Sequence, residues 1–102
     1  MKTMELINSI NPLLHDRVRL AIMVTLVNAD KPIEFNILLE ALSLTKGNLS
    51  SHSQKLEEAK LIKVTKEFVD RKPRTSYVCT ELGRKEIKNY LKQIEQILIQ
   101  SK

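Results

Sequence analysis

The side chains that could do chemistry lie in two short stretches in the middle of the chain. In the first stretch, Asn and Gln can pair with adenine edges, Ser can bond to several bases, and Lys can bind a phosphate. The second stretch is a short basic run around a proline. The candidate residues are Thr45, Lys46, Asn48, Ser50, Ser51, His52, Gln54 and Lys55 in the first stretch, and Arg71, Lys72, Arg74 and Thr75 in the second.

Helical spacing divides the first stretch into an inner and an outer face. Leu49, Ser53, Leu56 and Ala59 recur at steps of three and four residues, which predicts the inner stripe of a helix. Thr45 is the expected N-cap, and the free N–H groups that follow it, together with Lys46, suit a phosphate. The outer face then presents Asn48, Ser51, Gln54 and Lys55, with Ser50 and His52 at its margins.

Positive charge is concentrated in the same region. The 102 residues carry 17 Lys and Arg against 12 Asp and Glu, a net charge of +5, and the pI is near 9.5. Residues 1–44 have a net charge of −1, residues 45–79 of +4 and residues 80–102 of +2. This balance favours a polyanionic partner without identifying one.

Other classes of chemistry lack the residues that they need. Cys79 is the single cysteine, so no disulfide within one chain and no multi-cysteine metal site is expected, and His15 and His52 have no carboxylate or thiol at ligand spacing. We find no nucleophile and base pairing, phosphate loop or carboxylate dyad, so we expect neither an enzyme nor a cofactor. Cys79 is more readily explained as a small core residue than as a redox sensor.

Length and hydropathy indicate one soluble domain. A chain of this size has room for one core, and it contains no repeat, low-complexity run or flexible linker. The longest apolar stretch, Leu20 to Leu26 broken by Thr25, is far shorter than the ~20 residues of a membrane span. The single cysteine favours a reducing compartment, so we expect the protein in the cytoplasm.

The segments on the N-terminal side of the outer face read as short helices. A helix is expected from Pro12 or Asp16 to Asn28, apolar on several sides and therefore central. A very short strand or extended segment follows at residues 33–35, and Asn36 is the expected cap of a helix over residues 37–42. The next helix runs from Thr45 to about Lys60, so residues 36–60 form a helix-turn-helix.

A hairpin and a long helix complete the chain. Residues 61–80 alternate in the manner of two strands, and Asp70 to Pro73 form a basic tip between them. Residues 81–100 form a helix whose apolar stripe keeps a seven-residue spacing that suits a dimer seam. The N-terminal segment, residues 1–15, carries further apolar residues that need cover. The expected dimerisation residues are Ile87, Tyr90, Leu91, Ile94, Ile97 and Leu98.

The order of these elements resembles a winged helix-turn-helix. The run from Leu44 to Ile62 is similar to the recognition helix and first wing strand of small bacterial and archaeal regulators of the MarR-like and ArsR-like families. Asp16 to Leu20, Arg71 to Thr75 and Thr80 to Arg84 are further matches, so the resemblance covers nearly the whole chain. It departs from the families at Ser53, where a large apolar residue is usual, and at Lys60, where a glycine commonly closes the helix.

The resemblance implies a mainly helical fold with a small β-hairpin and a single winged-helix domain over residues 1–102. It also implies a homodimeric transcriptional regulator that binds double-stranded DNA, with its recognition helix in the major groove and its wing on the flanking backbone or minor groove. ArsR-like metal sensors are recognised by paired cysteines, which this chain lacks. An effector is possible in such families, but no residue marks a pocket for one.

Several alternatives remain open at this point. A winged helix can serve as a protein-interaction module, or bind DNA without sequence preference as an architectural protein. The basic tip could be merely solvated, and Gly47 could permit close approach to a DNA backbone or be a tolerated first-turn glycine. The basic side of the last helix could lie on a membrane surface, although Glu86 and Glu95 dilute its charge.

Overall fold

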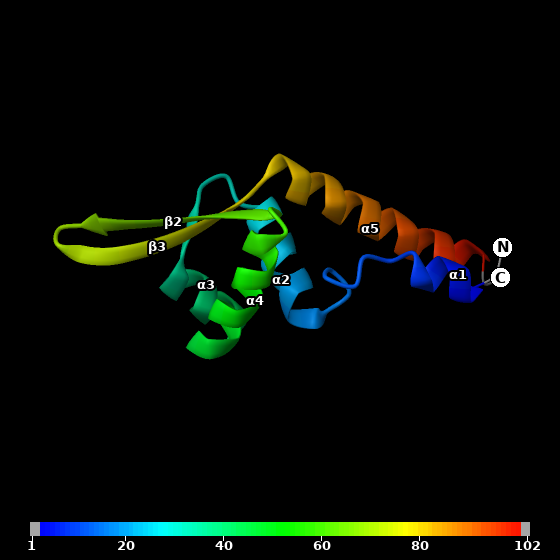
Figure 1. The fold of residues 1–102 in the computed structure, drawn as a ribbon, viewed down its shortest axis with the longest axis horizontal. Coiled ribbons are helices and arrows are strands. Elements are labelled where there is room, and N and C mark those ends of the chain that lie inside the picture. The colour runs from blue at the N-terminus through cyan, green and yellow to red at the C-terminus, as the bar shows by residue number, and fades with distance from the viewer. Residues whose placement is uncertain (1–2, 101–102) are drawn as a thin grey trace.

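The computed structural model describes residues 3–100 and confirms the expected fold class, mainly helical with a small antiparallel sheet. The molecule is elongated, with extents of 56 × 25 × 21 Å. The hairpin projects from one end and the last helix from the other (Figure 1). The elements are α1 (Thr3–Asn8), α2 (Arg17–Val27), β1 (Ile33–Glu34), α3 (Phe35–Leu42), α4 (Lys46–Glu58), β2 (Ile62–Val69), β3 (Lys72–Cys79) and α5 (Glu81–Gln100).

The central helix α2 begins after Asp16, whose carboxylate accepts a hydrogen bond of 2.9 Å from the Arg19 N–H. Pro12 lies in a separate turn, in which the Asn11 side chain accepts from the Leu13 N–H. Of the two starts that the sequence allowed, the structure therefore has the one at Asp16. α2 packs against α3, α4, α5 and β3, which explains why its apolar residues are spread over several sides.

The helix-turn-helix is formed by α3 and α4. α3 begins one residue earlier than Asn36, with Glu34 at its N-cap and no side-chain cap, so the expected cap at Asn36 is wrong. Thr45 caps α4 as expected, because its hydroxyl accepts from the Asn48 N–H at 3.1 Å. α4 ends at Glu58, and Ala59 is exposed rather than part of the inner stripe, because the chain turns away at this point.

The sheet has the strand order β1-β3-β2 with all neighbours antiparallel. β2 and β3 are joined by a two-residue turn, Asp70 and Arg71, with φ angles of 52° and 67°. This is the turn geometry that matches the twist of a hairpin. The expected loop to Pro73 is thus too long, since β3 already begins at Lys72. Pro73 is tolerated in β3 because β1 pairs only with Ser76 and Tyr77 and leaves that edge open.

A junction around Thr80 connects α4, the hairpin and α5. The Thr80 hydroxyl donates to the carbonyl oxygens of Lys60 at 2.7 Å and Leu61 at 3.1 Å, and it accepts from the Gly83 N–H at 2.9 Å. Lys60 has a φ of 64°, the left-handed conformation that glycine adopts most readily. The Thr80 hydroxyl therefore ties the connection between α4 and β2 to the connection between β3 and α5.

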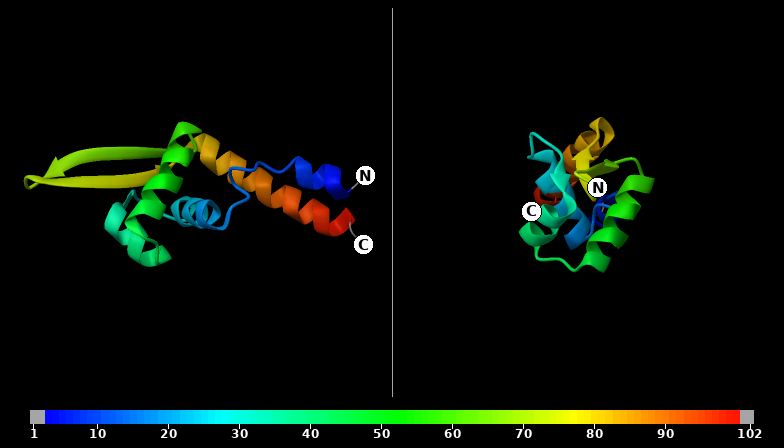
Figure 2. Two further views of the ribbon diagram at one scale, coloured as in Figure 1. Left: turned by 60° about the horizontal axis from the view of Figure 1, so that its bottom comes forward. Right: turned by 90° about the vertical axis from the view of Figure 1, so that its left-hand side faces the viewer.

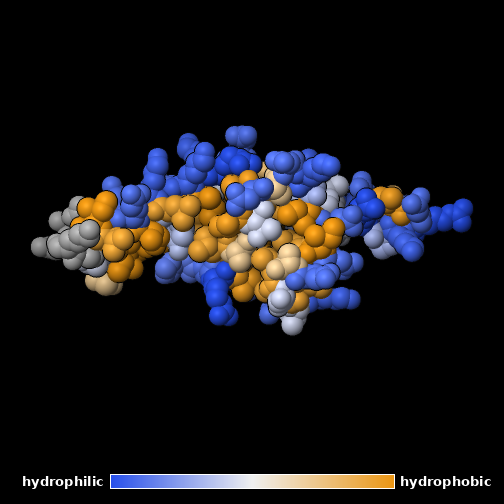
Figure 3. Space-filling view, turned by 180° about the vertical axis from the view of Figure 1, so that it is seen from behind, coloured by the Kyte–Doolittle hydropathy of each residue, from blue (hydrophilic) through white to orange (hydrophobic). Residues whose placement is uncertain are grey.

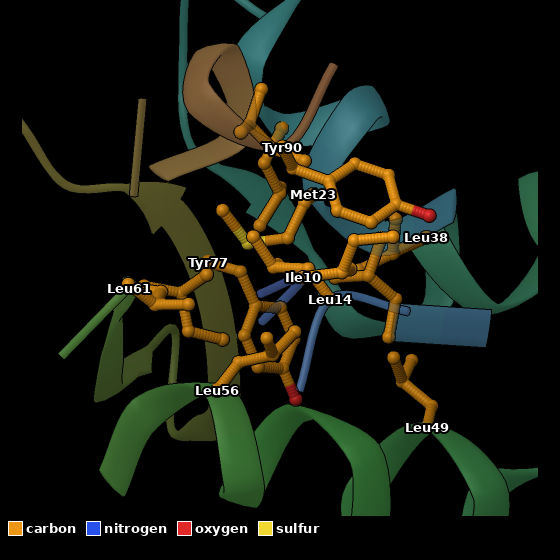
Figure 4. Packing of buried hydrophobic residues seen from close by; sticks show 13 residues of the cluster. Ile10, Leu14, Met23, Leu38, Leu49, Leu56, Leu61, Tyr77 and Tyr90 are labelled. Atoms are coloured by element: carbon orange, nitrogen blue, oxygen red, sulfur yellow. The ribbon is translucent and has the colours of Figure 1, made fainter. Parts of the chain in front are cut away.

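The core lies where α2, α4 and the base of the hairpin meet. Leu49 and Leu56 of α4 point into it, and Leu56 lies beside Tyr77 (Figure 4). Ile87 and Tyr90 are also buried, 3% and 5% exposed. They pack in the core of their own chain, which corrects their expected place in a dimer seam. Ile97 is half-buried against the same core.

α1 lies beside the C-terminal half of α5, and together they form an arm that projects from the core (Figures 1 and 2). The Gln93 side chain donates to the Ser9 carbonyl at 3.1 Å, and the His15 ring bonds to the Tyr90 hydroxyl at 3.0 Å. Several apolar side chains of this arm are exposed: Met4, Ile7, Leu91, Ile94, Leu98 and Ile99. Within residues 3–100, no helix is both long and apolar enough to cross a membrane.

Candidate nucleic-acid interface

The outer face of α4 is the polar surface that its periodicity predicts. Leu49 and Leu56 are completely buried and Ser53 is 4% exposed, so the helix is fixed in one rotation. The candidate side chains on the other side are open to solvent. The exposed residues are Thr45, Lys46, Asn48, Ser50, Ser51, Gln54 and Lys55.

The first turn of α4 is open to an approaching backbone. The Thr45 hydroxyl is used by the cap, while Lys46 and Gly47 are exposed. A Cβ added at Gly47 would have no neighbour within 4 Å, so the fold itself does not require glycine there. Helix N-termini present unpaired N–H groups and a partial positive charge, which suit a phosphate oxygen.

His52, which was expected at the margin of the outer face, is half-buried and turned towards α2. Its Nδ1 lies 3.0 Å from Arg19 Nη1 and 3.9 Å from an Asp16 carboxylate oxygen. The Arg19 Nε donates to the Leu13 carbonyl at 2.6 Å, which fixes the guanidinium. The hydrogen bond from the Arg19 backbone holds the pKa of Asp16 below its ordinary value of 3.8, opposed in part by burial. His52 therefore holds α4 on α2, a role the sequence alone did not indicate.

The basic residues near the tip of the hairpin differ in how freely they can meet an anion. Arg71 and Lys72 are exposed and make no ion pair within residues 3–100. Arg74 Nε lies 3.7 Å from a Glu34 carboxylate oxygen, and both side chains are a little over 40% exposed. Thr75 is half-buried. Within the described residues, the tip thus offers Arg71 and Lys72 without an ion pair, whereas the charge of Arg74 is partly neutralised by Glu34 of β1.

A groove of about 420 Å³ separates α4 from the hairpin. Residues of α4 line it on one side, and residues of β2 and β3, with Phe35 of α3, line the rest; the α4 residues are Ser50, Ser53, Gln54 and the acidic Glu57. Burial raises the pKa of Tyr77 of β3, so its hydroxyl stays protonated and can donate. The hairpin residues that line the groove are Val64, Lys66, Thr75 and Tyr77.

Lys66 is a candidate that the sequence analysis missed. Successive strand residues point to opposite faces, so Lys66 shares a face with Ile62 and Val64, which are turned towards the core. It pairs across the hairpin with Thr75 and lies across the groove from Gln54. The alternation was visible in the sequence, but it becomes informative only once the hairpin face is known to adjoin α4.

The described residues offer little for other chemistry. No group of three or more His, Cys, Asp or Glu side chains within residues 3–100 could hold a metal ion. Cys79 is half-buried and its thiol donates to the Thr80 carbonyl at 3.3 Å. Burial raises the pKa of this thiol, which disfavours the reactive thiolate.

Comparison with known proteins finds a matching family and a similar solved structure. A sequence profile of the family described as winged helix DNA-binding domain matches residues 18–98. A transcriptional regulator homologue from Pyrococcus horikoshii OT3 has a solved structure that superposes with a TM-score of 0.82 and 34% identity, covering 96% of this chain and 95% of the other. An uncharacterized protein of Methanocaldococcus jannaschii is 41% identical over 64 residues, which are 63% of this chain and 70% of that protein.

More distant solved structures share the fold. The S. aureus MepR–DNA complex superposes with a TM-score of 0.69 at 18% identity, covering 84% of this chain and 69% of MepR. AbsC, a MarR family transcriptional regulator from Streptomyces coelicolor, superposes with a TM-score of 0.66 at 20% identity, covering 98% of this chain and 70% of AbsC.

Proposed function

The chain belongs to the winged helix DNA-binding domain family, and from this premise we propose that it is a homodimeric transcriptional regulator that reads double-stranded DNA. In this proposal α4 enters the major groove of one half-site, and the hairpin contacts the flanking backbone or minor groove. The protein acts in the cytoplasm, and residues 1–102 work as one unit. The P. horikoshii relative, described as a transcriptional regulator homologue, supports the regulatory role.

The exposed polar face of α4 beside a basic hairpin is the observation that carries the proposal. Asn48 and Gln54 can each form two hydrogen bonds with an adenine, while Ser50 and Ser51 can donate or accept. None of these side chains is needed for the core, because α4 is held by Leu49 and Leu56. The side chains on this outer face of α4 are therefore available to contact bases without loss of core packing.

Phosphate contacts follow from the charges that flank this face. Lys46 lies at the N-terminus of α4, Lys66 lines the groove, and Arg71 and Lys72 lie at the tip of the hairpin. We assign these side chains, with Lys55, Arg74 and Thr75, to the DNA backbone, where contacts give affinity and register rather than sequence preference. His52 contributes by orienting α4 through Arg19.

The dimer is proposed from the arm formed by α1 and α5. Leu91 is 52% exposed and Leu98 is 66% exposed, and Met4 and Ile7 of α1 are exposed on the same arm. Apolar residues gather at this end of the molecule (Figure 3). A patch of this kind on a soluble protein indicates an interface, and a second copy of the chain would cover both arms symmetrically.

The test is selection of duplex from a random library by the purified protein, followed by titration at several salt concentrations. We expect enrichment of a pseudo-palindromic site. If the dimer neutralises about eight phosphates, the logarithm of the affinity should fall against the logarithm of the salt concentration with a slope near −7, about 0.9 for each phosphate. Equal recovery of all sequences would instead indicate an architectural protein. Absence of duplex binding, or a slope shallower than about −2, would leave only a protein-interaction module.

A further inference from the structure

Phe68 is an apolar side chain with no cover near the tip of the hairpin. It is 78% exposed, more than any other large apolar residue in residues 3–100. It lies directly across the ladder from Pro73, so the two form an apolar pair two residues before and after the turn. Figure 3 shows an isolated apolar spot near the end of the hairpin, surrounded by hydrophilic residues.

Strand alternation fixes the side of the hairpin to which Phe68 belongs. Ile62, Val64, Lys66 and Phe68 share one face of β2. Val64 and Lys66 line the groove against α4, so Phe68 continues the same wall beyond the end of the groove. A ligand that runs along the outer face of α4 and past Lys66 would next meet Phe68.

The surrounding charge indicates what kind of partner would cover Phe68. The hairpin, residues 62–79, carries five basic and two acidic side chains, and Arg71 and Lys72 follow Phe68 within four residues. A second hairpin tip would carry the same positive charge and would be repelled. A polyanion with an apolar interior fits both features, and duplex DNA has phosphates outside and stacked bases within.

We propose that Phe68 enters the minor groove beside the site of α4 and partly unstacks one base step, while Arg71 and Lys72 hold the phosphates on either side. This inference rests on the proposed function, and it adds an apolar wedge to an otherwise polar interface. Apolar wedges unstack and kink DNA at the step they enter. Because pyrimidine–purine steps deform most easily, Phe68 reads sequence through deformability at a step that forms no hydrogen bond with the protein.

The experiment compares Phe68→Ala and Phe68→Leu with the wild type on the duplex that the wild type enriches from a random library. Leu can still act as a wedge, whereas Ala cannot reach between bases. Leu82→Ala is the control, since Leu82 is an exposed apolar residue at the start of α5, outside the candidate interface. The fluorescent base 2-aminopurine, placed at one position of the duplex at a time, reports unstacking at that position. Energy transfer between two dyes at the ends of the duplex reports the bend.

With the wild type, we expect 2-aminopurine fluorescence to rise at one step next to each half-site. Phe68→Ala should remove that rise, reduce the bend and weaken binding about tenfold, the order of the loss when one aromatic contact to a base is removed. Phe68→Leu and Leu82→Ala should stay within about threefold of the wild type. The salt slope should not change in any variant, because no charge is removed.

Three results would overturn the inference in different ways. If the wild type enriches and binds a duplex but Phe68→Ala binds and bends it equally well, the wedge is wrong while the regulator stands. The wedge is also wrong if Phe68→Ala changes the sedimentation of the free protein instead of its DNA affinity, since Phe68 would then contact another chain. If the wild type does not bind duplex at all, the proposed function fails first and the wedge fails with it.

Discussion

Lys60 adopts a left-handed backbone conformation, with a φ of 64°, where α4 ends and β2 begins. This conformation costs a residue with a Cβ about 1–2 kcal/mol, whereas glycine adopts it freely. We therefore expect Lys60→Gly to raise the free energy of unfolding by up to about 1 kcal/mol, after the larger unfolded-state entropy of glycine is subtracted. Urea unfolding measures the change. Glu57→Gly, inside α4, is the matched control and should lose about 1 kcal/mol; an equal loss at Lys60 would contradict the argument.

Asp16 is the residue at which a charge and a helix cap coincide. Its carboxylate caps α2 and faces Arg19 and His52, and its pKa is lowered chiefly by the backbone hydrogen bond from Arg19. Asp16→Ala should lose about 1 kcal/mol at neutral pH, and Asp16→Asn only part of that. Because the folded-state pKa lies below the unfolded one, this stabilisation is present above about pH 4 and is lost as the pH falls through the folded value.

Urea unfolding at neutral pH and again near pH 2.5 distinguishes the charge from the cap. The gap between wild type and Asp16→Ala should narrow as the pH is lowered, because protonation of the folded-state carboxyl removes the charge. A gap that keeps its full size in acid would mean that the charge contributes nothing.

Base contacts and backbone contacts should separate by substitution at single residues. Gln54→Ala or Asn48→Ala should lose about 1–3 kcal/mol on the selected site and little on random duplex. Arg71→Ala should weaken both by a similar factor and make the salt slope shallower by about one for each chain's contact. Titration of the two duplexes measures both effects. Unchanged site preference in Gln54→Ala and Asn48→Ala would show that a different face of α4 meets the bases.

Residue roles were predictable where a single local interaction decides them. Thr45 caps α4 and Leu49 is buried, because hydroxyl capping and helical periodicity act within one turn. Asn36 fails as a cap because the chain enters α3 directly from β1, a pairing with β3 more than 40 residues away. The contacts of His52 with Arg19 and Asp16 were not predictable for the same reason, since these partners come from α2 and its N-cap.

At the scale of elements, Gly83 and Gly47 can be compared, because the space around their Cα atoms differs. A Cβ at Gly83 would overlap the carbonyl oxygen of Leu61 and approach the Cys79 sulfur to 3.0 Å, whereas Gly47 has open space around it. Gly83→Ala should lose about 1–3 kcal/mol by forcing the base of the hairpin away from α5. Gly47→Ala should be neutral or gain up to about 1 kcal/mol, because alanine favours the helix.

Thermal or urea unfolding of both variants tests the pair, and DNA titration of Gly47→Ala adds a functional result. A fully folded Gly47→Ala that binds duplex several-fold more weakly would identify close approach of the DNA backbone as the reason for glycine. Equal stability of the two variants would contradict the packing described at Gly83.

The order and type of the elements were predictable, and their ends were less so. The hairpin was expected from alternation, but its turn was expected to extend to Pro73, because Arg71, unlike glycine, does not favour the positive φ that a two-residue turn requires. Lys66 and Phe68 were not among the candidate interface residues of the sequence analysis, because a hairpin pattern does not tell which face adjoins a helix.

At the scale of the whole molecule, the arm of α1 and α5 carries the proposed dimer. Leu91→Asp combined with Ile94→Asp should yield a monomer that still folds, because both side chains are exposed in the single chain. Charge in a dry seam is strongly unfavourable. Asn89→Asp with Gln96→Asp is the control, since it adds the same charge at exposed polar positions of α5 and should leave the dimer intact.

Sedimentation at micromolar concentration measures the state of each variant. Binding to duplexes with altered spacers supplies the functional readout, since only a dimer depends on half-sites about 34 Å apart. A wild type that sediments as a monomer, or a double aspartate variant that remains dimeric, would exclude this seam. Of the residues that the sequence analysis placed in a seam, Ile87 and Tyr90 are buried in their own chain, because the N-terminal half of the α5 stripe packs on the core.

Because α5 begins at the Thr80 junction, a small change of angle there would displace the far end of this long helix. α5 has 20 residues and is about 30 Å long, and it begins beside the hydrogen bonds that fix the ends of α4 and the hairpin. A tilt of about 5° at that junction moves the far end of the helix by about 3 Å. In a dimer joined at the far ends, the same tilt changes the distance between the two copies of α4. In the proposed dimer, a substitution at Thr80 would therefore change the half-site spacing that is bound, while every candidate DNA-contacting residue stays the same.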